Sequence, residues 1–208
     1  MKPRTNNTLL IIGLCIMAVM LSPFSALGGE TYKFERMWPT LHQPWYFGDV
    51  EGISVDKDGY VYITDAYSHS IRKFSPDGHL VTRWGGYGKE AGKFNGPNQV
   101  AIDDNDGWLY VIEKYNNRVQ KFTLNGEFIA VWEGDEHKFQ RPRRIAVDKK
   151  GIVYVSDTYN YRIQKFNSDG VPRVTKWGIK CDRDKGCENG EFIKPQGIAF
   201  DSKGDVYV

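Results

Sequence analysis

Four polar residues occupy the same place in four successive copies of a repeated sequence pattern, and they are the first candidates for chemistry. Each stands just before a short apolar run, and together they are Glu51, Asn98, Arg143 and Gln196. Arg143 could hold a carboxylate or a phosphate on a ligand through two parallel hydrogen bonds. Alternatively, Glu51 neutralises the charge of Arg143 across the channel and no ligand is needed. Because the four residues differ while the pattern around them repeats, they suit a ligand-binding surface; the alternative is a solvated rim with no ligand.

Catalytic and metal-binding residues are harder to find in this sequence. The histidines are His42, His69, His79 and His137, and they fall at four different places in the repeat, so repetition does not bring them to one metal ion. The sequence also contains no Ser/His/Asp set, no phosphate-cradling glycine loop and no dinucleotide fingerprint. It therefore predicts no catalytic residue, no metal site and no cofactor, and favours a binding module over an enzyme.

An insertion at residues 179–190 contains Cys181 and Cys187, the two cysteines that remain once residues 1–28 are set aside. In an exported protein such a close pair predicts a disulfide. A zinc ion would need two further ligands, and the sequence places none nearby. Asp182 and Asp184 have the spacing of calcium ligands, but they alternate with basic residues, which favours a solvated turn.

The elements that position these residues come from a strand, a tight turn and a second strand that recur at residues 61–74, 109–122 and 153–166. Aspartates at positions 56, 103, 148 and 201 close the preceding apolar runs at spacings of 47, 45 and 53 residues, which are periods typical of propellers, solenoids or arrays. The segments are rich in β-branched and aromatic residues and lack helical periodicity. Four short strands per unit predict an all-β fold, a β-propeller built from four-stranded blades.

Blade geometry predicts which residues share a face. The first strand of a blade leaves one face, the second strand returns to it, and the turn between the second and third strands lies there too. The four polar residues should therefore ring the mouth of the central channel on that face, which we call the mouth face. The turns add three more ligand-binding candidates, Tyr67, Tyr115 and Tyr159.

The repeated residues themselves are interpreted as architecture. The four aspartates that set the period should cap turns by accepting backbone N–H groups. Asp65, Glu113 and Asp157 could pair with Arg118 and Arg162. Trp84, Trp132 and Trp177 should pack between blades with Phe74, Phe122 and Phe166.

The repeated pattern resembles the NHL repeat, which reads P-x-G-I-A-V-D-x-x-G-x-V-Y-V-x-D-x-x-N-x-R-I-Q-K-F followed by W-G. Residues 195–208 together with 153–166 match this pattern almost throughout. The resemblance implies a propeller, usually of six blades, with repeats here at about 50–84, 97–132, 142–178 and 195–208. Residues 31–38 resemble the closing outer strand of a last blade, so we expect residues 29–208 to form an incomplete propeller domain. Departures are Ser68 and Ser70 for Asn and Arg, Glu113 for Asp and Arg144 for Gly.

Some family members resembling this chain are lyases that cleave peptidyl-α-hydroxyglycine. They carry a metal-binding histidine at the position of Glu51, Asn98, Arg143 and Gln196, where this sequence has none. A tyrosine that some of them use is matched by Tyr159, but equally by Tyr67 and Tyr115. The alternative function is accordingly a propeller enzyme of the lyase or lactone-hydrolase kind, with catalytic residues partly in blades beyond Val208.

Residues 1–28 resemble a secretory signal peptide. Lys2 and Arg4 are followed by 13 uncharged residues at 9–21 and by a small-residue cleavage site at 26–28. The alternative is an uncleaved membrane anchor, although a span needs about 20 apolar residues. We expect an exported protein that is secreted, periplasmic or at the cell surface.

Removal of the signal leaves 26 basic and 26 acidic residues. A neutral chain lacks the basic balance that phosphate-driven nucleic-acid binding needs, which argues against an RNA binder. The sequence thus predicts a scaffold that binds a protein, peptide or glycan at or outside the cell envelope. Nucleic acid is not an expected partner, and membrane contact is expected only through an uncleaved signal.

Overall fold

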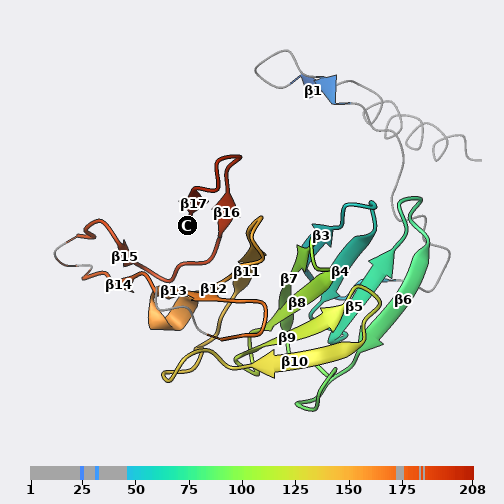
Figure 1. Cartoon of the computed structure of the whole chain (residues 1–208), viewed down its shortest axis with the longest axis horizontal. Helices are drawn as coiled ribbons and strands as arrows, with labels where there is room; N and C mark the ends of the chain where they lie inside the picture. The colour runs from blue at the N-terminus through green and yellow to red at the C-terminus, as the bar shows by residue number, and fades with distance from the viewer. Residues whose placement is uncertain (1–23, 26–30, 33–45, 172–175, 183, 185) are drawn as a thin grey trace, which may run out of the picture. The chain divides into compact units, whose positions relative to one another are not determined.

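The computed structural model describes residues 24–25, 31–32, 46–171, 176–182, 184 and 186–208 (Figure 1). The chain divides into two compact units, Met1–Trp38 and Pro39–Val208. In the first, β1 (Phe24–Ser25) pairs antiparallel with β2 (Thr31–Tyr32). The predicted signal peptide at 1–28 and closing strand at 31–38 otherwise lie outside the described residues. Among the described residues, no helix is both long and apolar enough to cross a membrane.

The second unit begins with two four-stranded antiparallel sheets, one for each of the first two repeats. The first contains β3 (Val50–Val55), β4 (Val61–Asp65), β5 (Ser70–Phe74) and β6 (Leu80–Gly85), paired in chain order. The second contains β7 (Pro97–Asp103), β8 (Trp108–Glu113), β9 (Arg118–Thr123) and β10 (Phe128–Trp132), again in chain order.

The third repeat forms β11 (Arg144–Val147), β12 (Val153–Asp157) and β13 (Arg162–Phe166), with the short 3-10 helix η1 (Thr158–Asn160) in its turn. Trp177 forms a bridge to Ile163 at the place of a fourth strand. The insertion contains a parallel pair, β14 (Ile179–Lys180) and β15 (Glu191–Phe192). The fourth repeat supplies β16 (Ala199–Phe200) and β17 (Val206–Tyr207). These meander sheets confirm the predicted all-β propeller fold.

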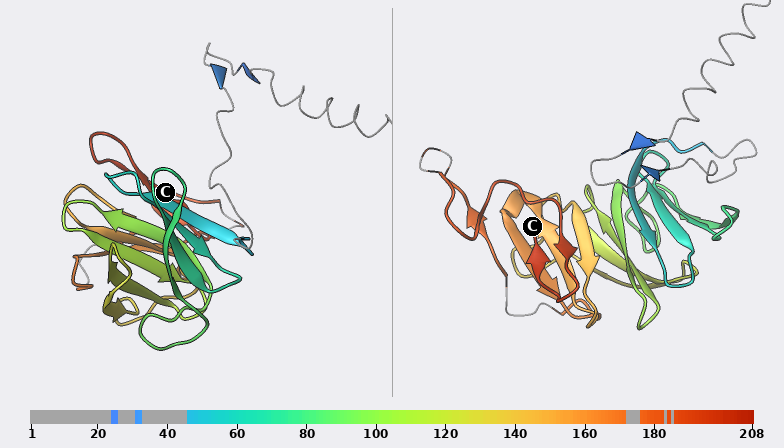
Figure 2. Two further views of the ribbon diagram at one scale, coloured as in Figure 1. Left: turned by 90° about the vertical axis from the view of Figure 1, so that its right-hand side faces the viewer. Right: turned by 90° about the horizontal axis from the view of Figure 1, so that it is seen from above.

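The sheets of the second unit follow one another in chain order, from teal through green to orange in Figures 1 and 2. Their first strands lie next to each other: the Ser54 hydroxyl of β3 donates to the Val100 carbonyl of β7 at 2.8 Å, and Arg144 of β11 reaches Asn98 of β7. Every residue of β5 and β12 is buried. In β12, Val155 packs with the second repeat and Tyr154 lies against Phe200 of the fourth repeat. In β5, Ile71 packs with the second repeat and Arg72 lies against the Phe47 ring.

Aromatic rings from consecutive repeats fill the space between sheets. Trp84 of the first repeat lies 6.1 Å from Phe122 of the second, and Trp132 of the second lies 6.3 Å from Phe166 of the third, measured between ring centroids. Trp177 stacks on Tyr154 at 5.7 Å. The prediction that the tryptophans pack between blades is confirmed for Trp84 and Trp132, whose partners come from the following repeat.

Glycine is required where a turn meets these rings. Gly126 has a φ of +89°, and a Cβ built on it would lie 2.7 Å from the Trp84 ring. Gly170 has a φ of +76° and stands equally close to Trp132. A Cβ is disfavoured at such a φ and would also displace the ring. The Asn-Gly and Asp-Gly turns of one repeat thus fit under the tryptophan of the repeat before.

The aspartates that set the period cap turns, as predicted. Asp56 Oδ1 accepts the backbone N–H groups of Asp58 and Tyr60 at 3.0 and 2.8 Å. Asp148 repeats this arrangement with Lys150 and Ile152. Because these bonds satisfy turn N–H groups that no strand pairs, the aspartates serve the architecture.

Candidate functional site

A buried carboxylate at the end of each second strand organises the turn that is predicted to lie on the mouth face. In the third repeat, Asp157 accepts hydrogen bonds from Asn160 at 2.8 Å, Arg162 at 2.9 Å and Gln164 at 2.7 Å. Glu113 holds the corresponding asparagine, arginine and glutamine of the second repeat. The predicted pairing with Arg118 and Arg162 is therefore confirmed, within one repeat in each case.

The first repeat keeps the network with different donors. Asp65 accepts the Arg72 guanidinium at 2.8 Å and backbone N–H groups of Gly48, Asp49 and Ser68. Burial alone would raise the pKa of Asp65, but the hydrogen bonds, led by those of Ser68 and Gly48, outweigh it and hold that pKa below its usual value. The turn is thus built around an ionised group.

Two of the predicted mouth residues sit at β-bulges. The pairing between β3 and β4 shifts register between Val50 and Gly52, which leaves Glu51 as the extra residue. The pairing between β7 and β8 shifts in the same way around Asn98. A bulge re-aims the side chain of its extra residue. The backbone at Glu51 and Asn98 therefore departs from the regular strand pairing of its neighbours.

Four of the seven predicted residues line one hollow of about 340 Å³ between the first two repeats. Glu51, Tyr67, Asn98 and Tyr115 lie there with Asp49, Ala66, His69, Gly96 and Lys114. Both tyrosines are largely exposed, at 79 % and 54 %. Lys114 Nζ lies 4.9 Å from the Tyr115 ring centroid. The hollow combines acidic, basic, amide and aromatic groups, which can contact a ligand carrying both polar and apolar groups.

His69 is one of the lining residues that the sequence did not predict as site residues. Its φ is +50°, and Asn117 and Tyr161, at the same place in later repeats, have φ values of +53° and +56°. His69 Nδ1 accepts the backbone N–H of Gly96 at 3.2 Å. The repeat register is the signal that could have identified His69, because the residue at this place in the turn has a left-handed backbone in each of the three repeats. From there, the His69 side chain reaches Gly96 of the next repeat.

Three other predicted residues lie at the third and fourth repeats. Arg143 donates Nη1 to Gln196 Oε1 at 3.2 Å, so its side chain bonds to Gln196 and not to Glu51. Two cations lie close to the Tyr159 ring, with Lys194 Nζ at 4.8 Å and Arg141 Cζ at 5.4 Å from its centroid. The positive charges of Lys194, Arg141 and Arg143 lower the pKa of Tyr159. The seven candidates thus fall into two groups, the hollow and this basic cluster.

Asn98 and Arg144 connect the second repeat to the third. Asn98 is buried at 3 % exposure, and its side-chain oxygen accepts Arg144 Nη1 at 2.7 Å. Its backbone oxygen accepts the Thr64 hydroxyl at 3.2 Å. Asn98 is therefore tied into the structure, and its role as a ligand contact remains a prediction.

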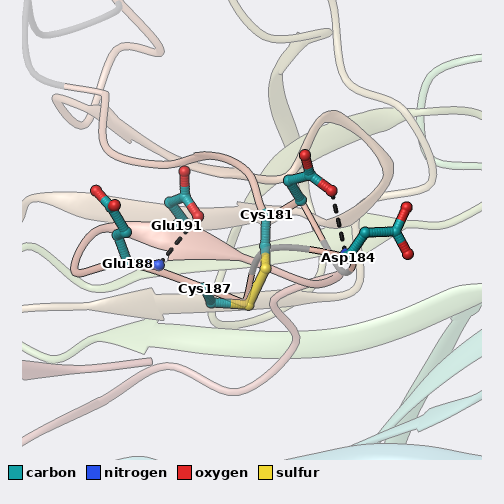
Figure 3. Close-up of a disulfide and its surroundings, with 6 residues drawn as sticks. Cys181, Asp184, Cys187, Glu188 and Glu191 are labelled. Carbon is teal, nitrogen blue, oxygen red and sulfur yellow. Dashed lines mark hydrogen bonds between the residues drawn. A yellow bond between two sulfur atoms is a disulfide. The ribbon is translucent and has the colours of Figure 1, made fainter.

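The insertion carries a disulfide between Cys181 and Cys187, whose Cα atoms are 5.1 Å apart (Figure 3). Asp182 accepts the backbone N–H of Asp184 at 3.1 Å, and Glu191 accepts that of Glu188 at 3.0 Å. The strand Ile179–Lys180 precedes this loop and Phe192 closes it. Among the described residues, no three His, Cys, Asp or Glu side chains gather closely enough to hold a metal ion.

Comparison with known proteins agrees with the repeated architecture. The NHL repeat model matches residues 47–74, 94–122 and 139–166. The chain is 19 % identical to a streptogramin B lyase structure, with a TM-score of 0.58, covering 86 % of this chain and 51 % of that one. It is 18 % identical to virginiamycin B lyase from Staphylococcus aureus, with a TM-score of 0.57 and coverages of 76 % and 47 %.

A third similar structure is a nidogen/laminin complex, at 21 % identity and a TM-score of 0.53, covering 74 % of this chain and 53 % of that one. The chain spans about half the length of the structures it matches. No curated protein sequence matches it. Identities this low show a shared fold. Its three matched repeats and its sheet architecture place this chain in the NHL repeat family.

Proposed function

We propose that the protein is an exported NHL-repeat propeller that binds a protein, peptide or glycan through its mouth face. The observation that carries the proposal is a contrast between two kinds of position. Framework positions use the same bonds in successive repeats, as the carboxylate networks of Glu113 and Asp157 do. Mouth positions carry four different side chains, and the backbone bulges where Glu51 and Asn98 stand.

The hollow supports this proposal because its groups are accessible and chemically mixed. Tyr67 and Tyr115 are exposed aromatic residues, and tyrosine supplies contact area with little loss of conformational entropy on binding. Glu51 and Lys114 line the same hollow and provide charges of both signs. The stable framework beneath these residues would keep them in place before a ligand arrives.

Binding should be sought on glycan and peptide arrays with the full chain, and any hit should then be measured in solution. Tyr115→Ala should weaken binding at least tenfold, which corresponds to about 1.4 kcal/mol, without lowering the unfolding temperature. Tyr207→Ala removes another exposed tyrosine outside the hollow and should leave binding unchanged. Equal losses in both variants, or no hit on any array, would contradict the proposal.

Export is supported by the charged, apolar and small-residue parts of the segment at 1–28. Expressed with its own N-terminus, the protein should be recovered outside the cytoplasm and begin near residue 29. N-terminal sequencing of each cell fraction tests this. Recovery of the unprocessed chain in the cytoplasm alone would contradict it.

The alternative function is an enzyme of the lyase or lactone-hydrolase kind. Its specific support is His69, which lies in the hollow with Glu51 and two tyrosines and uses Nδ1 to accept the Gly96 N–H. That bond places the proton of a neutral His69 on Nε2. If the alternative holds, His69→Gln abolishes turnover of a lactone or lyase substrate; if the binding function holds, no turnover of these substrates is seen in the unaltered protein.

A further inference from the structure

The basic cluster around Tyr159 contains two residues in an unfavourable backbone conformation. Arg141 has a φ of +44° and Lys194 has a φ of +54°. They occupy the same place in the third and fourth repeats, and the second repeat has Gly96 there with a φ of +64°. A left-handed backbone favours glycine, and strained residues that persist tend to cluster at functional sites. The third and fourth repeats both replace a suitable glycine with a cation.

The cations of this cluster differ from the arginines of the framework. Arg72, Arg118 and Arg162 are each buried and paired with a carboxylate of their own repeat. Within the described part of the chain, Arg141, Arg143 and Lys194 form no ion pair with any acidic side chain. Like charges repel one another, so placing three of them around one tyrosine leaves a net positive field there. An anion would complete the charge balance.

The backbone of the cluster is held by neighbouring repeats. Asn117 of the second repeat accepts the Arg141 N–H at 2.7 Å. The preceding residue, Gln140, donates its N–H to Asp157 at 2.7 Å and accepts that of Tyr159 at 3.1 Å. On the other side, the Pro195 carbonyl next to Lys194 accepts the Thr158 hydroxyl at 2.8 Å. The cations are therefore carried on fixed backbone, as an organised binding site requires.

We propose that Arg141, Tyr159 and Lys194, with Arg143 beside them, form a subsite for an oxyanion, either a carboxylate or a phosphate. The planar guanidinium groups match either oxyanion with two parallel N–H donors, the lysine adds a point charge, and the tyrosine hydroxyl adds a further donor. This inference deepens the proposed function and rests on it, because it assigns the acidic part of the mouth-face ligand to the third and fourth repeats.

The test titrates the full chain with citrate and with inorganic phosphate at constant ionic strength and follows the Tyr159 ring and arginine Nε signals by NMR. A saturable shift is expected with at least one probe, and the tighter probe identifies the class of anion. Arg141→Gly and Lys194→Gly should each weaken binding about tenfold or more. Both glycines suit the positive φ, so the unfolding temperature should not fall.

Lys138→Gly is the matched control. Lys138 also has a positive φ, of +49°, but it pairs with Glu133 outside the cluster, so its removal should leave anion binding unchanged. Shifts that never saturate, or an equal loss in Lys138→Gly and Arg141→Gly, would overturn the inference.

The two proposals fail in different ways. If an array ligand is lost in Tyr115→Ala and fully retained in both Arg141→Gly and Lys194→Gly, the oxyanion subsite is wrong and the mouth-face function stands. If at least one anion probe binds as expected while no array ligand binds, the subsite stands as an anion site and the mouth-face function fails.

Discussion

At the scale of single residues, one buried carboxylate explains the polar residues that recur in the second and third repeats. Glu113 and Asp157 are fully buried, and each accepts an asparagine, an arginine and a glutamine that lie three, five and seven residues later. An ionised group without such donors would be costly in this position. The network therefore fixes the second-to-third turn, and with it the tyrosine that the turn presents.

Removal of the buried carboxylate should lower the free energy of unfolding most in the repeat whose arginine pairs with no other acidic side chain. In Glu113→Ala, Arg118 keeps backbone carbonyls but loses its carboxylate, and we expect a loss of about 3–5 kcal/mol in the free energy of unfolding. In Asp157→Ala the loss should be smaller, because Asp135 still pairs with Arg162. Urea unfolding measures both. Asp58→Ala, at an exposed pair, should change stability by less than about 0.5 kcal/mol.

The basic cluster also predicts an unusual titration. Lys194, Arg141 and Arg143 favour the tyrosinate form, so the pKa of Tyr159 should lie below its usual value of about 10. Ultraviolet difference absorbance during alkaline titration, with Tyr159→Phe to assign the signal, measures this pKa. Arg141→Gly and Lys194→Gly should raise it toward its usual value, and Lys138→Gly should not. A Tyr159 pKa at or above its usual value would contradict the arrangement.

Residue types and spacing predicted the mouth positions, but they could not reveal which side chains bond to one another there. Glu51 and Tyr115 follow from the repeat alone and do line one hollow. The left-handed backbone at Arg141 and Lys194 was not predictable, because the glycine that stands at the matching position 96 indicates such a conformation and a basic residue does not. The Arg143–Gln196 bond depends on side-chain placement between repeats, which no local pattern encodes.

At the scale of elements, strand-turn-strand units could be predicted because apolar alternation and turn residues are local signals. The pairing of β14 with β15 could not, since the insertion has no counterpart in other repeats. The contacts of Trp84 and Trp132 with a turn of the following repeat also depend on how the sheets pack.

That contact predicts a difference between two glycine substitutions. Gly126→Ala and Gly107→Ala both place alanine at positive φ, but only Gly126 lies against Trp84, while Gly107 has nothing within 4 Å of the added atom. Gly107→Ala should cost about 1 kcal/mol for backbone strain. Gly126→Ala should cost about 1–3 kcal/mol more, for displacing the ring. Thermal unfolding with tryptophan fluorescence measures both, and equal losses would argue against the packing.

The disulfide should act on the insertion that contains it. Replacing Cys181 and Cys187 together with serine should lower the free energy of unfolding by about 2 kcal/mol on the chain-entropy model. Intact mass after alkylation without reductant should show no free thiol at these positions in exported protein. Two alkylated thiols in that protein would contradict the disulfide.

At the scale of the whole molecule, successive repeats place corresponding residues beside one another, and this brings the mouth positions of different repeats together. Gln196 meets Arg143 across 53 residues of sequence, and Arg144 meets Asn98 across 46. The fold was predictable for this reason: one repeat period sets the strands, the turns and the shared face. The ligand was not, because it depends on the few positions where the repeats differ.

The central claim is that binding uses the mouth face, and chemical-shift mapping tests it most directly. The isotopically labelled full chain would be titrated with the tightest glycan or peptide from the arrays, and backbone amide signals followed to saturation. The account predicts that the largest shifts lie at the starts of the first strands and in the second-to-third turns, around Glu51, Tyr115, Arg143 and Tyr159. Largest shifts in the aspartate-capped turns at 56–59 and 148–151, or along the outer strands β6 and β10, would contradict it.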